Sequence, residues 1–132
     1  MEFFSIGKKF TRCLAITPEL MKRYGDLSGD CNPLHIDDQY ARSKGFNGRV
    51  TYGNIYGMLL SALVGMDLGH PEVMLLSERF DFRKPVYIGD AIELTATVTA
   101  ISVSARVIEL TLKFCNTAAE LIAAGKCQVR CL

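Results

Sequence analysis

An aspartate and a histidine five positions apart, Asp30 and His35, are the residues of this sequence best suited to acid–base chemistry. Between them lies Asn32-Pro33, where the proline ring fixes its own φ and disfavours a helical Asn32, so the loop has a defined shape. Because histidine titrates near neutral pH and burial raises the pKa of a carboxyl group, the two form a candidate acid–base pair acting on one water molecule. As an isolated pair, they are also compatible with a turn cap and a surface histidine.

Gly53 is a second candidate, because it stands where the most apolar helix of the chain is expected to begin. The N–H groups at a helix N-terminus carry partial positive charge and have no partner inside the helix. Glycine also lets a ligand carbonyl approach the backbone closely, so Gly53 could stabilise the enolate-like oxygen that forms when water adds beside a thioester carbonyl. Without further context, Gly53 is also compatible with an ordinary helix start.

Short helices are expected on the N-terminal side of Gly53. Thr17-Pro18-Glu19 has the cap, the first-turn proline and the acidic residue typical of a helix start. This helix should run to about Leu27 and stop at Gly29. A polar loop over residues 30–37 and a short helix over about residues 38–44, closed by Gly45, follow it.

The strongest helix is expected from Gly53 to about Leu68, where Gly69-His70-Pro71 prevents its continuation. Its apolar stripe recurs at helical spacing and comprises Ile55, Met58, Leu59, Ala62, Leu63 and Met66. Since Leu60 and Val64 are apolar outside this stripe, we expect the helix to be buried on most sides.

The rest of the chain is expected to form strands, over residues 6–16 and throughout the part after residue 72. Apolar and polar residues alternate in residues 92–100, 108–114 and 125–131, and a turn is expected at residues 116–120. Connections this short favour antiparallel pairing. Wrapping such a sheet round the long helix buries both apolar surfaces, which predicts an α+β hot-dog fold in a single domain over residues 1–132.

Composition excludes several classes of function. The formal charge is +1 with no basic cluster, so we expect no nucleic-acid partner. The five cysteines include no Cys-x-x-Cys pair and the two histidines lie far apart, so we expect reduced thiols, a cytoplasmic location and no metal site. We also expect no secretory signal, and the most apolar stretch, residues 55–68, is too short to span a membrane.

One long motif gives these candidates a context. Ser28-Gly-Asp-Cys-Asn-Pro-Leu-His-Ile-Asp37, followed by Ala41, Gly45-Phe46, Gly48-Arg49 and Gly53, resembles the hydratase motif of the (R)-specific enoyl-CoA hydratases, the MaoC-like dehydratase family. Phe82-Arg-Lys-Pro-Val-Tyr-Ile-Gly-Asp90 is similar to the second recurrent segment of that family. The resemblance covers nearly the whole chain.

The resemblance implies a fold, an assembly and a set of roles. Members are hot-dog proteins, usually dimers or assemblies of dimers, that bind the acyl chain beside the central helix and use no metal or redox cofactor. The residues matching Asp30 and His35 hold the catalytic water, and the N–H matching Gly53 polarises the thioester carbonyl. Asn32 supports the loop, and Ser61 matches a polar residue near the site.

Two positions modify this implication. Many members have histidine immediately before the helix-start glycine, whereas this chain has Tyr52, which can donate a hydrogen bond but stays neutral near pH 7. We expect Tyr52 to contact the substrate, so the substitution affects the expected substrate choice and rate. Arg83 and Lys84 could contact the phosphates of coenzyme A or of a carrier-protein arm, although charges on a strand edge also have a solvated, purely structural explanation.

The sequence therefore predicts reversible (R)-specific hydration of a trans-2-enoyl thioester, carried on coenzyme A or on an acyl-carrier protein, by a homodimer or an assembly of dimers. Two alternatives remain open. A hot-dog thioesterase would need a carboxylate aimed at the thioester, commonly from the long helix, and residues 54–66 contain no Asp or Glu. A non-catalytic acyl-thioester-binding module is the other alternative.

Overall fold

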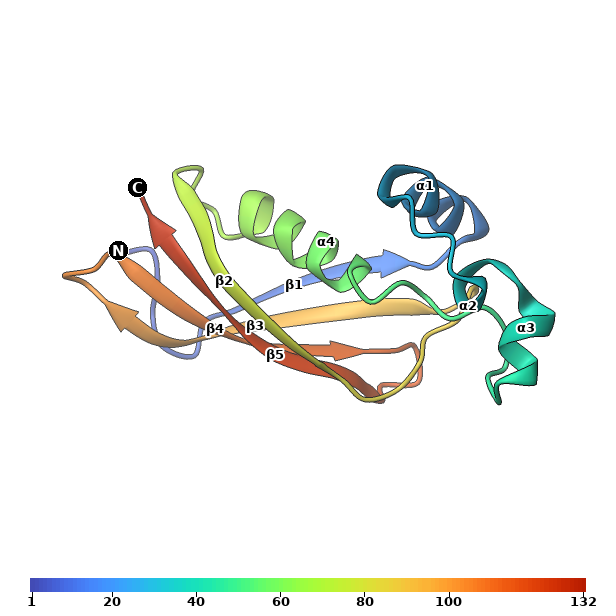
Figure 1. Ribbon diagram of the computed structural model, residues 1–132. Coiled ribbons are helices and arrows are strands. Elements are labelled where there is room, and N and C mark those ends of the chain that lie inside the picture. Colours follow the sequence, from blue (N-terminus) through green and yellow to red (C-terminus); the bar gives the residue numbers. More distant parts are fainter.

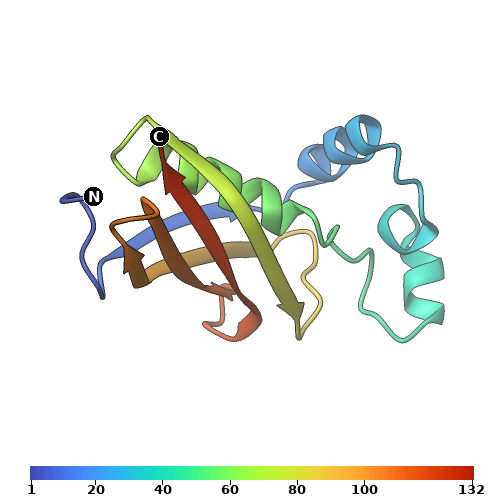
Figure 2. The same ribbon diagram turned by 60° about the vertical axis from the view of Figure 1, so that its left-hand side comes forward.

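In the computed structural model, which describes residues 1–132, five antiparallel strands form one curved sheet around a central helix (Figure 1, Figure 2). The strands are β1 (Lys9–Ala15), β2 (Val73–Phe82), β3 (Ala91–Ser102), β4 (Val107–Cys115) and β5 (Leu121–Cys131). Their order in the sheet is β1-β3-β4-β5-β2, so β1 and β2 are the two edges. This arrangement confirms the predicted α+β hot-dog fold with about five antiparallel strands.

The inner face of the sheet follows from the alternation in the sequence. Along β5, Cys127, Val129 and Cys131 are buried and the residues between them are exposed, as predicted. Gly125 of β5 is paired with Phe80 of β2, and a Cβ at Gly125 would stand 1.9 Å from the carbonyl oxygen of Arg79. No side chain fits at this position, so the close pairing of β2 with β5 depends on glycine.

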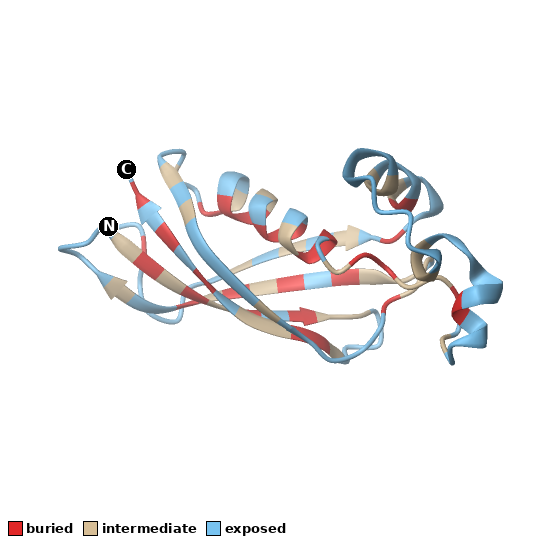
Figure 3. Ribbon diagram, viewed as in Figure 1, coloured by how far each residue is buried: buried red, intermediate tan, exposed pale blue.

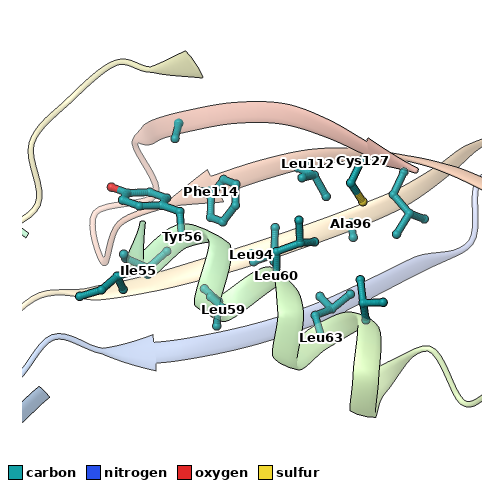
Figure 4. Close-up of a cluster of buried hydrophobic side chains, with 14 of the residues drawn as sticks. Ile55, Tyr56, Leu59, Leu60, Leu63, Leu94, Ala96, Leu112, Phe114 and Cys127 are labelled. Atoms are coloured by element: carbon teal, nitrogen blue, oxygen red, sulfur yellow. The ribbon is translucent and has the colours of Figure 1, made fainter. Parts of the chain in front are cut away.

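The central helix consists of α4 (Ile55–Ala62) and a continuing π-helical turn, η1 (Leu63–Asp67). One face packs into the concave sheet against β3, β4 and β5 (Figure 4). The buried residues on this face are Ile55, Tyr56, Leu59, Leu60, Leu63 and Val64. Leu60 is fully buried in the same apolar cluster as Leu94 of β3, so the centre of the core is where the helix meets the sheet.

The prediction that this helix is buried on most sides is wrong. Met58 and Met66, which belong to the predicted stripe, are 41% and 75% exposed, and Ser61 is exposed between them. Figure 3 shows buried and exposed colours alternating along this helix. A single sheet layer covers only one side of a helix, so the opposite face stays open. The π-helical turn adds to the difference between the predicted stripe and the observed buried face. Its hydrogen bonds from i to i+5 change the spacing at which residues return to one face.

The segment between β1 and α4 extends beyond one end of the sheet (Figure 1). It contains α1 (Pro18–Ser28), α2 (Pro33–Ile36) and α3 (Asp38–Ser43), and residues 17–54 are called the α1–α3 segment below. The predicted boundaries of α1 are confirmed: the Thr17 hydroxyl accepts a hydrogen bond from the Leu20 N–H at 3.0 Å, and Gly29 ends the helix at φ 74°. The predicted polar loop is partly wrong, because it contains the single turn α2.

Gly89 and Asp90, at the end of the segment formed by residues 82–90, form hydrogen bonds that connect neighbouring parts of the sheet. Gly89 has φ 96°, a conformation that favours glycine, and its N–H donates to the Ile16 carbonyl at the end of β1. The Asp90 carboxylate accepts hydrogen bonds from Ala91 and from both the N–H and the hydroxyl of Thr117. Burial acts to raise the pKa of Asp90, but these hydrogen bonds outweigh it and hold the pKa below its ordinary value.

Candidate active site

Asp30 is held by the turn that follows α1. Its backbone N–H donates to the Ser28 hydroxyl at 3.2 Å, and its Oδ1 accepts a hydrogen bond from the Asn32 N–H at 3.1 Å. This second contact is an Asx turn, a local hydrogen bond that short acidic side chains form readily. One carboxylate oxygen is therefore engaged by the backbone, while the other, Oδ2, faces His35.

His35 is placed by the single turn α2. The Asn32 side chain caps this turn by accepting a hydrogen bond from the Leu34 N–H at 2.9 Å, and Pro33 occupies its first position. The His35 Nδ1 lies 2.7 Å from the carbonyl oxygen of Val50. A carbonyl oxygen only accepts, so Nδ1 carries a proton and Nε2 is the atom presented to Asp30.

The two candidates face each other across a short gap. His35 Nε2 and Asp30 Oδ2 are 3.8 Å apart, beyond direct hydrogen-bond reach but suitable for one bridging water. The His35 side chain is 16% exposed and that of Asp30 is 46% exposed. The imidazole is therefore largely enclosed, whereas the carboxylate is open to an incoming molecule.

Tyr52 lies directly behind this pair. Its ring centroid is 4.2 Å from that of His35, and its hydroxyl donates to the Asp30 carbonyl oxygen at 3.0 Å. Burial, assisted by the charge of Asp30, raises the pKa of Tyr52, so the phenol remains protonated. Tyr52 is only 2% exposed, and its proton is already used within the chain.

Gly53 lies beside a hollow of about 380 Å³ that Asp30 also lines, together with Tyr24, Ser28, Tyr52 and Asn54. The Gly53 N–H donates no hydrogen bond within the chain. The helix itself begins at Ile55, with Asn54 at the cap, so Gly53, the predicted first residue, lies two residues before the observed helix start. An unused backbone donor therefore shares one hollow with the Asp30 carboxylate.

A second hollow, of about 310 Å³, also has Gly53 in its lining. Arg83 and Lys84 line it, but they differ in their partners. Lys84 Nζ forms an ion pair with Glu120, and this hydrogen bond lowers the pKa of Glu120, whereas the Arg83 side chain forms no ion pair or hydrogen bond. The two neighbouring cations therefore differ: Arg83 is available to a ligand, whereas Lys84 is already paired with Glu120.

The structure does not bring Ser61 to Asp30 and His35. It lies on the exposed face of α4, seven residues after Asn54, which is about 10 Å along a helix. A third hollow, of about 870 Å³, runs between β1, α1 and Met58 on this exposed side of α4. Tyr24 lines both this hollow and the one containing Asp30, so the two adjoin.

Sequence reasoning missed three residues around Gly53. Tyr24 is one of them, and the recurrence of Leu20 and Tyr24 on one face of α1 was the signal available for it. Thr51 and Tyr56 line the second hollow, where Thr51 Oγ1 is a buried polar atom without a hydrogen-bond partner. Burial, with a smaller effect of Asp90, raises the pKa of Tyr56 to about 12. No pattern in the sequence marks either residue.

The chain is similar to known proteins in sequence and in fold. The family model described as MaoC like domain matches residues 4–118. An (R)-specific enoyl-CoA hydratase of Rhodospirillum rubrum is 33% identical over 78 residues, covering 59% of this chain and 54% of that protein. A mitochondrial 3-hydroxyacyl-[acyl-carrier-protein] dehydratase of Arabidopsis thaliana is 32% identical over 97 residues, covering 74% and 56%. The matches thus span about half the length of these two relatives.

A solved structure matches along the whole chain. The (R)-hydratase from A. caviae involved in PHA biosynthesis superposes with a TM-score of 0.91 at 25% identity, covering 98% of each chain. No helix of the structure has both the length and the apolar character needed to cross a membrane.

Proposed function

The chain belongs to the MaoC-like domain family, and we propose that it adds water reversibly to a trans-2-enoyl thioester to give the (R)-3-hydroxyacyl thioester. The observation that carries this proposal is the pairing of Asp30 with His35 at 3.8 Å, beside a hollow that Asp30 shares with Gly53. The names of the relatives from R. rubrum and A. thaliana support the same hydratase and dehydratase chemistry.

In the proposed reaction, Asp30 and His35 hold one water molecule between Oδ2 and Nε2. The water oxygen bonds to the β-carbon while one of its protons passes to the pair. The electrons of the former double bond move onto the thioester, which becomes an enolate. Asp30 and His35 then return a proton to the α-carbon on the same face. One water is thereby added across the double bond, with Asp30 and His35 acting as a coupled unit.

Gly53 would stabilise the enolate oxygen. Its N–H is free of partners within the chain and lies on the hollow that Asp30 lines, so a thioester carbonyl could accept a hydrogen bond there while its β-carbon faces the water. Removing a single donor of this kind from an enzyme typically slows turnover by about 10²–10³-fold. Asn32 would act indirectly, by fixing both the Asp30 carboxylate and the turn that carries His35.

The test is hydration of crotonyl-CoA, followed by loss of the absorbance of the conjugated enoyl group. Asp30→Asn and His35→Ala should each lower kcat by about 10²–10⁴-fold, the range that general acid–base catalysis contributes. Matched controls are Asp81→Asn and His70→Ala, because both residues lie outside the three hollows. Wild-type rates in both site variants would show that the assignment is wrong.

Arg83 supports a phosphate-bearing carrier for the acyl group. It is an unpaired cation on the second hollow, which adjoins the first at Gly53, so a thioester bound at Gly53 could extend its carrier arm toward Arg83. Both coenzyme A and an acyl-carrier protein place phosphate on such an arm. Comparing crotonyl-CoA with a crotonylated carrier protein in the same assay distinguishes the two carriers by kcat/KM.

A homodimer is the proposed assembly, with larger assemblies built from it. The edge strand β2 leaves one side of its backbone unpaired and exposes Met74, Leu76 and Phe82. The central helix exposes Met58 in α4 and Met66 in η1. A long exposed edge with apolar side chains is a typical site for pairing with another chain. A twofold dimer could cover these surfaces and bring Ser61 into a complete acyl site. A protein that is monomeric in analytical ultracentrifugation yet fully active would contradict this assembly.

The two alternatives are distinguished in the same experiment. A thioesterase would release free coenzyme A, which a thiol reagent detects, whereas a hydratase keeps the thioester intact. A binding module would retain crotonyl-CoA in equilibrium dialysis without either reaction. Residues 54–66 provide no carboxylate from α4, and Asp67 at its end is paired with Arg12 at 2.9 Å, so the helix offers no free acidic group for hydrolysis.

A further inference from the structure

Three aromatic rings, those of Tyr24, Tyr52 and His35, pack against one another at tilted angles. The ring of Tyr24 in α1 lies 4.7 Å from that of Tyr52, which in turn lies 4.2 Å from the imidazole of His35. The Tyr52 hydroxyl reaches across to the Asp30 carbonyl oxygen at 3.0 Å. Tyr52 therefore contacts both members of the pair, through its ring face on one side and its hydroxyl on the other.

We propose that Tyr52 is a positioning residue: it fixes the plane of the His35 ring and the backbone of Asp30, and α1 keeps a glycine at position 25 to leave room for its hydroxyl. The inference deepens the proposed hydration reaction and rests on it. It differs from the substrate-binding role expected from the sequence, because the hydroxyl is turned to the chain's own backbone.

The remaining contacts of His35 explain why a ring face is needed. Its hydrogen bond to the Val50 carbonyl holds one nitrogen but does not by itself set the tilt of the ring, which could swing about that contact. Tyr52 packs against the face of the imidazole at an interplanar angle of 30° and limits this motion. Asp30 is likewise held at its N–H by Ser28 and at its carbonyl by Tyr52, so its backbone is fixed on both sides of the side chain.

Gly25 gives independent evidence for the position of the hydroxyl. It lies inside α1 with no left-handed φ, and glycine is less favourable than alanine at such a position. A Cβ at Gly25, however, would stand 2.6 Å from the Tyr52 hydroxyl oxygen. The hydroxyl could not easily move aside, because Tyr52 is buried between Tyr24 and His35.

A set of variants separates the ring from the hydroxyl. Tyr52→Leu removes both contacts and should lower kcat for crotonyl-CoA by about 100-fold, since misplacing a reacting group by about 1 Å has an effect of that size. Tyr52→Phe keeps the ring and loses one hydrogen bond, so its kcat should fall only about 10-fold. In both variants KM should stay within about threefold, because Tyr52 is only 2% exposed and offers little surface to a substrate in the hollow that it lines.

The Gly25 contact provides a rescue experiment. Gly25→Ala should lower kcat by pushing the hydroxyl aside, whereas Gly25→Ala combined with Tyr52→Phe should recover the rate of Tyr52→Phe alone, because the next ring atom would be at an ordinary 3.6 Å. Tyr87→Phe is the matched control: its hydroxyl also bonds to backbone, accepting from the Asn47 N–H at 3.2 Å, but away from the pair. Its kcat should be unchanged.

NMR of the imidazole groups tests the positioning without relying on activity. The chain has only two histidines, so a His70→Gln variant assigns the His35 signals. In the wild type and in Tyr52→Phe, the ring protons of His35 should be shifted upfield by the adjacent ring, and in Tyr52→Leu this shift should disappear. If the shift is the same in all three, or if Tyr52→Leu raises KM at unchanged kcat, the positioning role is overturned. A wild type with the shift but without hydration would instead overturn the proposed function.

Discussion

The sheet with its central helix and the α1–α3 segment are held together by different forces. Of the 25 buried residues in the main apolar cluster, the α1–α3 segment supplies only Met21 and Tyr52. The segment is instead organised by side-chain caps, such as those of Thr17, Asn32 and Asp37. The candidate catalytic residues thus lie on a part built from local hydrogen bonds, mounted on a part stabilised by apolar burial.

The difference shows how a site can be adjusted without weakening the fold. Apolar burial is roughly proportional to the area removed from water, so the stability of the sheet and helix is shared among many residues. A cap or a turn depends on one or two atoms, so a single substitution can move a catalytic group. Regions with few buried apolar contacts also open at lower free energy than the core.

The largest expected effect on stability lies in the central helix. Leu60→Ala removes a fully buried side chain and should lower the free energy of unfolding by about 2–5 kcal/mol. Denaturant unfolding measures this loss. Turnover per folded molecule should stay within about twofold, since Leu60 lines none of the three hollows. A loss of turnover in the folded fraction would contradict the separation of the two parts.

The converse substitution is Asn32→Ala, in the α1–α3 segment. Loss of a cap typically costs about 0.5–2 kcal/mol, and here it should appear as faster amide hydrogen exchange in residues 30–37 with a smaller change in global unfolding. Turnover should fall about 10-fold or more, because the Asn32 side chain caps the turn that carries His35. The hydrogen bond from the Asn32 backbone N–H to Asp30 is kept in this variant. Asp37→Ala, which removes the cap of α3, is the control and should leave turnover nearly unchanged.

Acid unfolding should reveal the contact between Asp90, at the start of β3, and Thr117, in the turn between β4 and β5. The pKa of Asp90 is lowered in the folded chain, so its carboxylate stabilises the fold above the ordinary value of 3.8, and this contribution is lost as pH falls through the lowered pKa. The difference in unfolding free energy between the wild type and Asp90→Asn should therefore shrink as pH falls below about 4. A difference that grows on acidification would contradict the assigned direction.

The smallest effect should separate the two neighbouring cations. Arg83→Ala should raise KM for crotonyl-CoA by about threefold to tenfold with little change in kcat, as expected for loss of one exposed phosphate contact. Lys84→Ala should change KM less, because Lys84 is already paired with Glu120. Equal effects would show that this ion pair opens when the substrate binds.

Much of this architecture could be predicted because its signals are local. Thr17, Pro18 and Gly29 mark the ends of α1, and the alternation along β5 gives its buried face. The proximity of Asp30 and His35 follows from a short loop that contains proline. Each of these features depends on residues that are close together in the chain.

The remaining features depend on contacts that a linear pattern does not contain. A single turn such as α2 is too short to show a period, and Met58 has the spacing of a core residue although it is 41% exposed. Lys84 is neutralised by Glu120, which lies 36 residues away. The stacking of Tyr52 on His35 likewise appears only when α2 and the start of α4 are placed in space.

The π-helical turn η1 has a consequence for changes in the length of the chain. A backbone hydrogen bond from i to i+5 encloses one more residue than the α-helical bond from i to i+4. The turn in η1 therefore contains one residue more than an α-helix would need there. Deleting exposed Gly65 would let this stretch close as an ordinary α-helix, with little displacement of Leu68 and β2. The same deletion within α4 would rotate every later residue by about 100° and turn the buried face away from the sheet. The C-terminal end of the central helix is thus where this protein could best absorb the loss of a residue.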